Sequence, residues 1–340
     1  MRLDYFAQAL GQLPDPADPL AVTEVDARFN LLSTLPSWLV HCRNLRVLRL
    51  SDNRLEDLPD DLGTLPELSV LQLSANPLRR FPPTLTRLPR LASLHLDQTG
   101  LETIPDDFHP PALVRLSLAR NRLDSLPESL FTTSVRLRFL GLQQNRLHSL
   151  PASVSSLSSL EHLDLSHNSL ERLPDAFGRL RRLRILFLQG NQLGKLPESF
   201  GALAALQQLT LHENHLTELP MSIGKLAVLE CLDASHNQLS TLPKSIAGWQ
   251  RLRRLVLSNN RLIELPAEFW QLRSLAHCSL PWNRLMDLPS AGDPACYLPN
   301  LRLLDCTHNA LPKSWVPPPA YRRSKRMMGR FITSWDHRLP

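Results

Sequence analysis

Residues 160–174 read LEHLDLSHNSLERLP and carry the pattern on which the chain is built. Leucine occupies the first, fourth, sixth, eleventh and fourteenth places of this stretch, asparagine the ninth and proline the fifteenth. The same pattern recurs along the chain, mostly at steps of 23 residues. Recurrence at a fixed step indicates stacked repeats that share one continuous core, so we expect one elongated domain.

The ninth place marks the repeats most clearly. Thirteen repeats follow one another over residues 22–312, and twelve of them have asparagine at this place. Thr99 fills the place in the fourth repeat, where we expect a weaker turn because threonine lacks the amide donors of asparagine. The ninth-place asparagines are Asn30, Asn53, Asn76, Asn121, Asn145, Asn168, Asn191, Asn214, Asn237, Asn260, Asn283 and Asn309.

Backbone chemistry explains the other places of the pattern. The first six places are expected to contain a short strand whose fourth and sixth side chains point inward, while the third and fifth point outward. The chain must then turn, and the asparagine side chain can bond to backbone groups that the turn leaves unpaired. Proline ends the turn, and a second apolar pair such as Phe177 and Leu180 brings the chain back to the core.

The pattern LxxLxLxxNxLxxLPxxxxxLxx over residues 22–312 resembles the leucine-rich repeat, in the 23-residue form found in intracellular Ras-group scaffolds, their plant relatives and bacterial effectors. This resemblance implies an α/β solenoid, a right-handed curved horseshoe. A parallel β-sheet would line its concave face, and short helical, 3-10 or irregular segments its convex face. The resemblance also implies protein binding, although a fold alone does not fix a function.

The N-terminal residues 1–21 are expected to form a cap over the open end of the stack, as terminal repeats require. Leu3, Phe6, Ala7 and Leu10 have helical spacing there and are followed by prolines. We therefore predict that this cap is a short helix.

Residues 313–340 are expected to form a C-terminal cap and a basic tail. They hold seven Lys or Arg residues against Asp336, so their charge of 7 − 1 = +6 equals the formal net charge of the chain. Three interpretations remain open: the tail closes the last repeat, contacts an acidic membrane surface weakly, or contacts nucleic acid. The residues predicted to contact an acidic surface are Arg322, Arg323, Lys325, Arg326 and Arg330.

Cysteine use favours a reducing compartment. The five cysteines are scattered, and residues 1–44 lack the cysteine cluster that caps extracellular relatives. No run of about 18 apolar residues exists, and early acidic residues and prolines interrupt any secretory signal. We expect a cytoplasmic protein, or alternatively one delivered into a host cell without a general secretory signal.

The outward strand residues are free to vary between repeats and therefore to bind a partner. Phe139, Ile185 and Phe187 lie in nearby repeats at the third or fifth place, where a solvated face would be polar. Exposed aromatics with a polar rim form binding hot spots, although isolated apolar residues are also ordinary on sheet surfaces. The predicted polar rim consists of Arg115, Arg120, His162, Asp164, His167 and Gln208.

Trp282, at the eighth place of the twelfth repeat, is a second candidate contact residue. Its neighbours on adjacent turns include Arg254, His277 and His308. The alternative is local packing against the long connection over residues 290–299.

The sequence lacks the motifs of common enzymes and metal sites. Phosphate-loop, GxSxG and kinase signatures are absent, and HENH at residues 212–215 is one residue short of HExxH. Seven histidines on or beside the strands are spread along the arc, whereas metal ligands must converge on one point. We therefore expect no catalytic residues, no metal, no cofactor and no small-molecule substrate.

These observations predict a non-enzymatic, monomeric scaffold that binds a protein partner on its concave face. One alternative is a bacterial effector that binds a host protein. Another is the recognition module of a larger enzyme such as a ubiquitin ligase, although residues 313–340 are too few for a catalytic domain with its own core.

Leu163 and Asp164 test the inward and outward assignments. Leu163→Ala should lower the free energy of unfolding by about 2–5 kcal/mol because it empties a core position. Asp164→Ala should change it little. Urea unfolding measures both variants, and equal losses would mean that the assignments are shifted by one residue.

Overall fold

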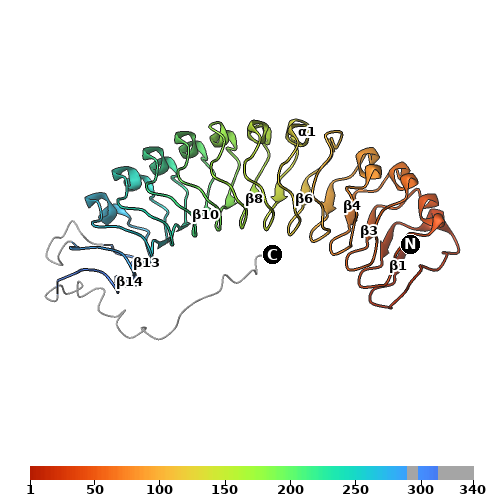
Figure 1. Ribbon diagram of the computed structural model, residues 1–340, viewed down its shortest axis with the longest axis horizontal. Coiled ribbons are helices and arrows are strands. Elements are labelled where there is room, and N and C mark those ends of the chain that lie inside the picture. The colour runs from red at the N-terminus through yellow and green to blue at the C-terminus, as the bar shows by residue number, and fades with distance from the viewer. Residues whose placement is uncertain (289–297, 313–340) are drawn as a thin grey trace.

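Three-residue strands stack in chain order along the inner side of an arc. The structure is a computed structural model that describes residues 1–288 and 298–312, and within these residues fourteen strands form one parallel sheet. The sheet lines the concave side of the arc, and short helices lie on its convex side (Figure 1). The predicted leucine-rich repeat solenoid is confirmed.

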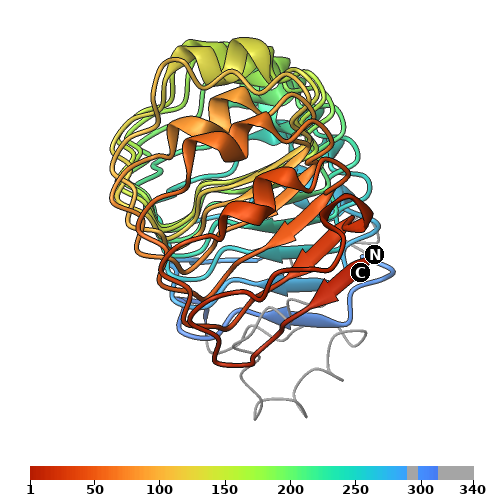
Figure 2. The ribbon, with the colours of Figure 1, turned by 90° about the vertical axis from the view of Figure 1, so that its right-hand side faces the viewer.

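Every strand pairs only with its chain neighbours, and the register is constant. Leu163 of β8, for example, lies between Leu140 of β7 and Leu186 of β9. Figure 2 shows the strands running side by side in one direction. The strands are β1 (Arg2–Asp4), β2 (Glu24–Asp26), β3 (Val47–Arg49), β4 (Val70–Gln72), β5 (Ser93–His95), β6 (Arg115–Ser117), β7 (Phe139–Gly141), β8 (His162–Asp164), β9 (Ile185–Phe187), β10 (Gln208–Thr210), β11 (Cys231–Asp233), β12 (Arg254–Val256), β13 (His277–Ser279) and β14 (Leu303–Asp305).

The convex elements of the described residues are mostly short 3-10 helices, and eight of these begin directly after the proline of their repeat. The 3-10 helices are η1 (Pro19–Ala21), η2 (Ser37–His41), η3 (Asp60–Thr64), η4 (Pro83–Arg87), η5 (Ala152–Ser156), η6 (Phe177–Arg179), η7 (Glu198–Ala202), η8 (Met221–Lys225), η9 (Lys244–Gly248) and η10 (Ala267–Gln271). The fifth repeat, one residue longer than the usual 23, instead forms the α-helix α1 (Glu128–Thr133).

The core fills the space between the sheet and the convex helices. Leu163 and Leu165 from the strand side and Phe177 and Leu180 from the convex side have no exposed surface. The predicted inward places and the predicted convex apolar pair are therefore confirmed.

Glycine allows the convex helices to approach one another closely. A Cβ atom on Gly178 would lie 1.8 Å from the carbonyl oxygen of Ser199, and one on Gly201 would lie 2.2 Å from that of Ser222. Neither separation is sterically possible, so these positions require glycine if the helices keep their spacing.

The ninth-place asparagines join each repeat to the one before it. The Asn168 Nδ2 group donates to the carbonyl oxygens of Leu165, in its own repeat, and Leu142, in the preceding repeat, both at 3.0 Å. Its Oδ1 accepts from the backbone N–H of Leu147 at 3.0 Å. Asn168 is only 9% exposed, so these bonds satisfy an amide that burial would otherwise destabilise.

The residue before each asparagine adopts the left-handed conformation that reverses the chain. His167 has φ 53° and Trp282 has φ 59°, although only one of these eighth places, Gly190, carries glycine. Other residue types reach this region at a steric cost. The asparagine bonds that follow hold the strained turn in place.

At Thr99, in the fourth repeat, the series of asparagine side-chain bonds between repeats is interrupted. Its hydroxyl donates to the carbonyl oxygen of Leu96 at 2.8 Å, within its own repeat. Leu78 of the preceding repeat, whose N–H would meet an asparagine Oδ1 elsewhere, bonds instead to the carbonyl oxygen of Asn76 at 2.9 Å. The turn keeps its shape, because Gln98 has φ 55°, but the bridge to the third repeat is missing.

The short helix predicted from the spacing of Leu3, Phe6, Ala7 and Leu10 does not form, because β1 occupies the first of these residues. Ala7 has φ 53°, which no right-handed helix allows, and Phe6 is 46% exposed. This segment instead forms backbone hydrogen bonds with the edge of the sheet: the Tyr5 N–H, for example, donates to the carbonyl oxygen of Asp26 at 2.7 Å.

Residues 1–14 instead form an incomplete repeat that the sequence analysis missed. Gln8 stands at the place of the asparagine, and Asn30 bridges back to this segment by accepting from the N–H of Leu10 at 2.9 Å. The other residues that match the pattern are Leu3, Tyr5, Leu10, Leu13 and Pro14.

Placing the asparagine of the repeat pattern at position 99 should stabilise the protein. We expect Thr99→Asn to raise the free energy of unfolding by about 1 kcal/mol, because the new amide can donate to the preceding repeat. Urea unfolding followed by circular dichroism measures this change. Asn168→Thr is the matched reverse variant and should lower stability; a loss of stability in both variants would contradict the bridging role of the asparagine.

Candidate protein-binding site

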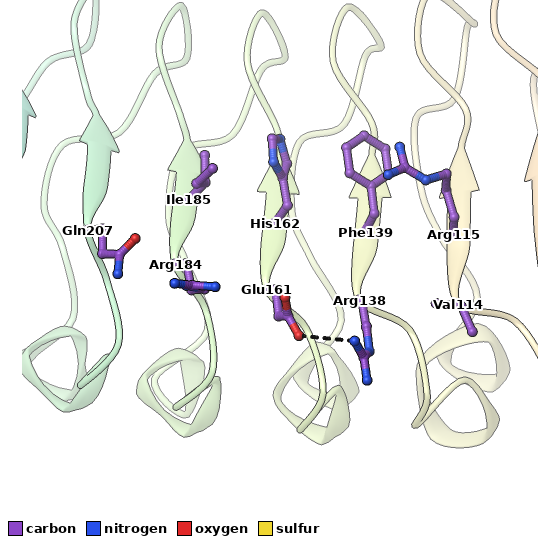
Figure 3. Close-up of a pocket in the computed structure, with 9 residues that line it drawn as sticks. All are labelled: Val114, Arg115, Arg138, Phe139, Glu161, His162, Arg184, Ile185 and Gln207. Carbon is purple, nitrogen blue, oxygen red and sulfur yellow. Dashed lines mark ion pairs between the residues drawn. The ribbon is translucent and has the colours of Figure 1, made fainter. Parts of the chain in front are cut away.

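The third-place side chains of five neighbouring strands form a row at the centre of the concave face. Arg115, Phe139, His162, Ile185 and Gln208 come from β6 to β10 in this order, and the constant register aligns them. Phe139, His162 and Ile185 are each partly buried. Figure 3 shows four members of this row, from Arg115 to Ile185.

Ring contacts hold the middle of this row together. The Arg115 guanidinium carbon lies 4.3 Å from the centre of the Phe139 ring. The centres of the Phe139 and His162 rings are 4.7 Å apart. The His162 ring is also perpendicular to that of Phe187, a fifth-place residue, with 5.4 Å between ring centres. Four of the residues predicted for partner binding therefore form one contact cluster.

A pocket of about 390 Å³ opens beside the row, toward the beginnings of the strands. Its third-place lining residues are Arg115, Phe139, His162 and Ile185. Its other lining residues occupy the second place of their repeats and are Val114, Arg138, Glu161, Arg184 and Gln207. The pocket thus combines apolar surface with a cationic margin.

The second-place residues were not among the predicted site residues. In strict strand alternation the second place would face the core with the fourth and sixth. The strands begin only at the third place, however, and the corner before them turns Arg138 and Arg184 outward, where both are exposed. Arginine and glutamate at these places, residue types rarely found in a core, were the available sequence signal.

The charges of Asp164 and Arg115 both affect the pKa of His162. Burial lowers the pKa of His162 below its usual value, the carboxylate of Asp164 acts in the opposite direction, and the guanidinium of Arg115 lowers it further. Asp164 also accepts hydrogen bonds from the backbone and hydroxyl of Ser166, at 3.0 and 2.7 Å. A neutral imidazole at the centre of the row is compatible with contact to an apolar group.

Two predicted rim residues lie at the turn beyond the strands. Arg120 donates from Nε to the Oε1 of Gln144 at 2.9 Å, along the eighth-place column. His167 is exposed and lies against Gly190, where an added Cβ atom would be 2.6 Å from its Nδ1. Neither residue lines the pocket.

Trp282 is far along the solenoid from this pocket and forms a separate feature. It is 57% exposed and stacks on His308, with 3.9 Å between ring centres and an angle of 11°. Most of residues 290–299, against which it was alternatively expected to pack, lie outside the described residues. The basic residues predicted to contact an acidic surface, all within 313–340, also lie outside them.

The residues that the structure describes contain neither a metal-binding cluster nor a helix able to span a membrane. Among residues 1–288 and 298–312, no group of three or more His, Cys, Asp or Glu side chains is arranged to hold a metal ion. In that part of the chain, no helix has the length and apolar character needed to cross a membrane.

The charges around His162 predict opposite effects of two substitutions. Arg115→Gln should raise the pKa of His162, because it removes a nearby positive charge, whereas Asp164→Asn should lower it, because it removes a negative one. NMR titration of the imidazole measures both shifts. Shifts of the same sign would contradict the arrangement of the three side chains.

Comparisons with known proteins agree with the repeat architecture. A model of a leucine-rich repeat region matches residues 116–215, a model of two leucine-rich repeat copies matches residues 43–83, and the single leucine-rich repeat matches residues 228–249 and 251–272. Among curated protein sequences, none gives a significant match.

Several solved structures share the fold over most of this chain. A leucine-rich repeat protein of Leptospira interrogans is 32% identical, with a TM-score of 0.84 over 91% of this chain and 79% of its own. The leucine-rich effector protein YopM of Yersinia pestis is 26% identical, with a TM-score of 0.66 over 94% and 86%. The plant peptide hormone receptor RGFR1, solved in complex with RGF2, is 26% identical, with a TM-score of 0.66 over 85% and 55%. Together with the repeat pattern, these matches show that the chain belongs to the leucine-rich repeat family.

Proposed function

We propose that this protein is a non-enzymatic scaffold that binds a protein partner through the centre of its concave face. The observation that carries the proposal is the cluster of Arg115, Phe139, His162 and Phe187, which places aromatic surface where the repeat pattern demands no apolar residue. Aromatic and arginine side chains supply a large share of the binding energy in protein interfaces.

The form of the site suits a protein segment. The row extends across five adjacent strands, and adjacent strands are about 4.8 Å apart, so it is much longer than a small ligand. RGFR1, a plant peptide hormone receptor that has the same fold, was solved in complex with RGF2. That likeness supports a protein or peptide partner, since both chains present a curved parallel sheet.

A reducing compartment is part of the proposal. Cys42, Cys231, Cys278 and Cys306 are free thiols, and burial raises the pKa of the Cys306 thiol to about 12. A protein with such unpaired cysteines suits the cytoplasm, where we propose that it acts as a monomer. Delivery into a host cell as an effector is the alternative, which the likeness to the effector protein YopM favours.

Partner capture with matched variants tests the binding surface. The Phe139→Ala, Phe187→Ala double variant should retain less than about one tenth of the partner bound by the original protein, because it removes both aromatic contacts. Quantitative mass spectrometry of proteins captured from the source cell measures this ratio.

The control is the Val135→Ala, Met221→Ala double variant. Both side chains are exposed, at 46% and 60%, and both lie outside the concave strands. It should capture the partner at the original level. If the two double variants capture equal amounts, and thermal unfolding shows both to be folded, the central cluster is not the binding surface.

A further inference from the structure

The concave face carries opposite charges on its two sides. The second and third places, where the strands begin, hold seven arginines and three glutamates in the thirteen repeats, a balance of 7 − 3 = +4. The arginines are Arg46, Arg115, Arg138, Arg184, Arg253, Arg254 and Arg302, and the acids are Glu24, Glu161 and Glu230.

The fifth, seventh and eighth places, where the strands end, have the reverse balance. They hold three arginines and seven acids, so their charge is 3 − 7 = −4. The acids are Asp26, Asp52, Asp97, Asp164, Glu213, Asp233 and Asp305, and the arginines are Arg28, Arg49 and Arg120. The face is therefore polarised across the strands, and this polarity would favour one orientation of a charged partner.

The central pocket lies on the cationic side of this division. Its lining contains Arg115, Arg138 and Arg184 but one acid, Glu161, so its charge is 3 − 1 = +2 with His162 neutral. Arg138 and Glu161 form an exposed ion pair at 3.7 Å, which is weak (Figure 3). Within the described residues, no carboxylate forms an ion pair with Arg115 or Arg184.

Apolar surface adjoins these cations. Phe139 and Ile185 stand on either side of His162, and the guanidinium of Arg115 covers the face of Phe139 (Figure 3). An apolar side chain placed here would cover both hydrophobic residues. Carboxylates beside it would reach arginine, which binds them with two parallel hydrogen bonds.

We propose that the partner contacts this pocket with an acidic peptide segment that carries an aliphatic or aromatic side chain. The apolar side chain packs over His162 against Phe139 and Ile185, and flanking carboxylates bind Arg138 and Arg184. A nucleic acid fits less well, because a uniform polyanion lying across the face would also meet the seven acids at the strand ends. This inference rests on the proposed function and names the chemistry of its partner.

Labelled synthetic peptides of equal length test this chemistry by fluorescence anisotropy with the full chain. The first probe has a central phenylalanine with two glutamates on each side. Three others replace the glutamates by glutamine, replace them by lysine, or replace the phenylalanine by alanine, and a single-stranded oligothymidylate carries the same number of charges. We expect the first probe to bind about tenfold more tightly than each of the others.

Charge exchange provides the matched protein variants. Arg138→Glu combined with Arg184→Glu should shift the preference from the glutamate-flanked to the lysine-flanked peptide. Arg146→Glu combined with Arg261→Glu changes the net charge equally at exposed tenth-place residues outside the pocket, and should leave the original preference unchanged.

The outcomes separate this inference from the proposed function. Equal binding of the glutamate- and glutamine-flanked peptides, lost in the Phe139→Ala, Phe187→Ala variant, would reject the acidic segment and retain the concave site. Peptide binding that survives this variant would place the peptide contact elsewhere and reject the inference. Equal binding of the oligothymidylate, or no binding of the acidic peptide, would reject the inference alone, because partner capture tests the function independently.

Discussion

The hydrogen bonds of the ninth-place asparagines are the interaction on which the rest of the structure depends. Each buried amide, as at Asn168, bonds to carbonyl groups of two successive repeats and accepts an N–H from the earlier one. A shift by one residue would leave these polar groups unpaired in the core. The asparagines therefore fix the register, and the register aligns the third-place side chains into one row.

This constraint divides the side chains into two groups with different freedom. Core leucines such as Leu163 are enclosed and must keep their size, whereas Arg115, Phe139 and Asp164 can change without affecting the stack. Binding specificity can therefore accumulate on a surface whose geometry is already fixed. The charge polarity of the concave face and its central aromatic cluster both arise in this variable group.

Much of the fold and part of the candidate site follow from periodicity. The period of two in a strand placed Phe139, His162 and Phe187 on the outer face, where they contact one another. The same alternation would place the Arg138 side chain in the core. It is exposed instead, because the strand begins one residue later and the preceding corner turns outward. The helical spacing around Phe6 predicted a helix that does not form, because this segment pairs with the edge of β2 through backbone hydrogen bonds that local spacing cannot reveal.

The sequence by itself determined the repeat, its inward leucines, the asparagine turns and the outward row, because each follows from local geometry repeated at a fixed step. Only the tertiary structure decided which outward residues meet. Stacking brings residues one repeat apart to neighbouring strands or turns, so Arg115 covers Phe139 while Trp282 stacks on His308 in a separate place. Side-chain rotamers and the corner before each strand set these contacts, and neither has a period that a sequence displays.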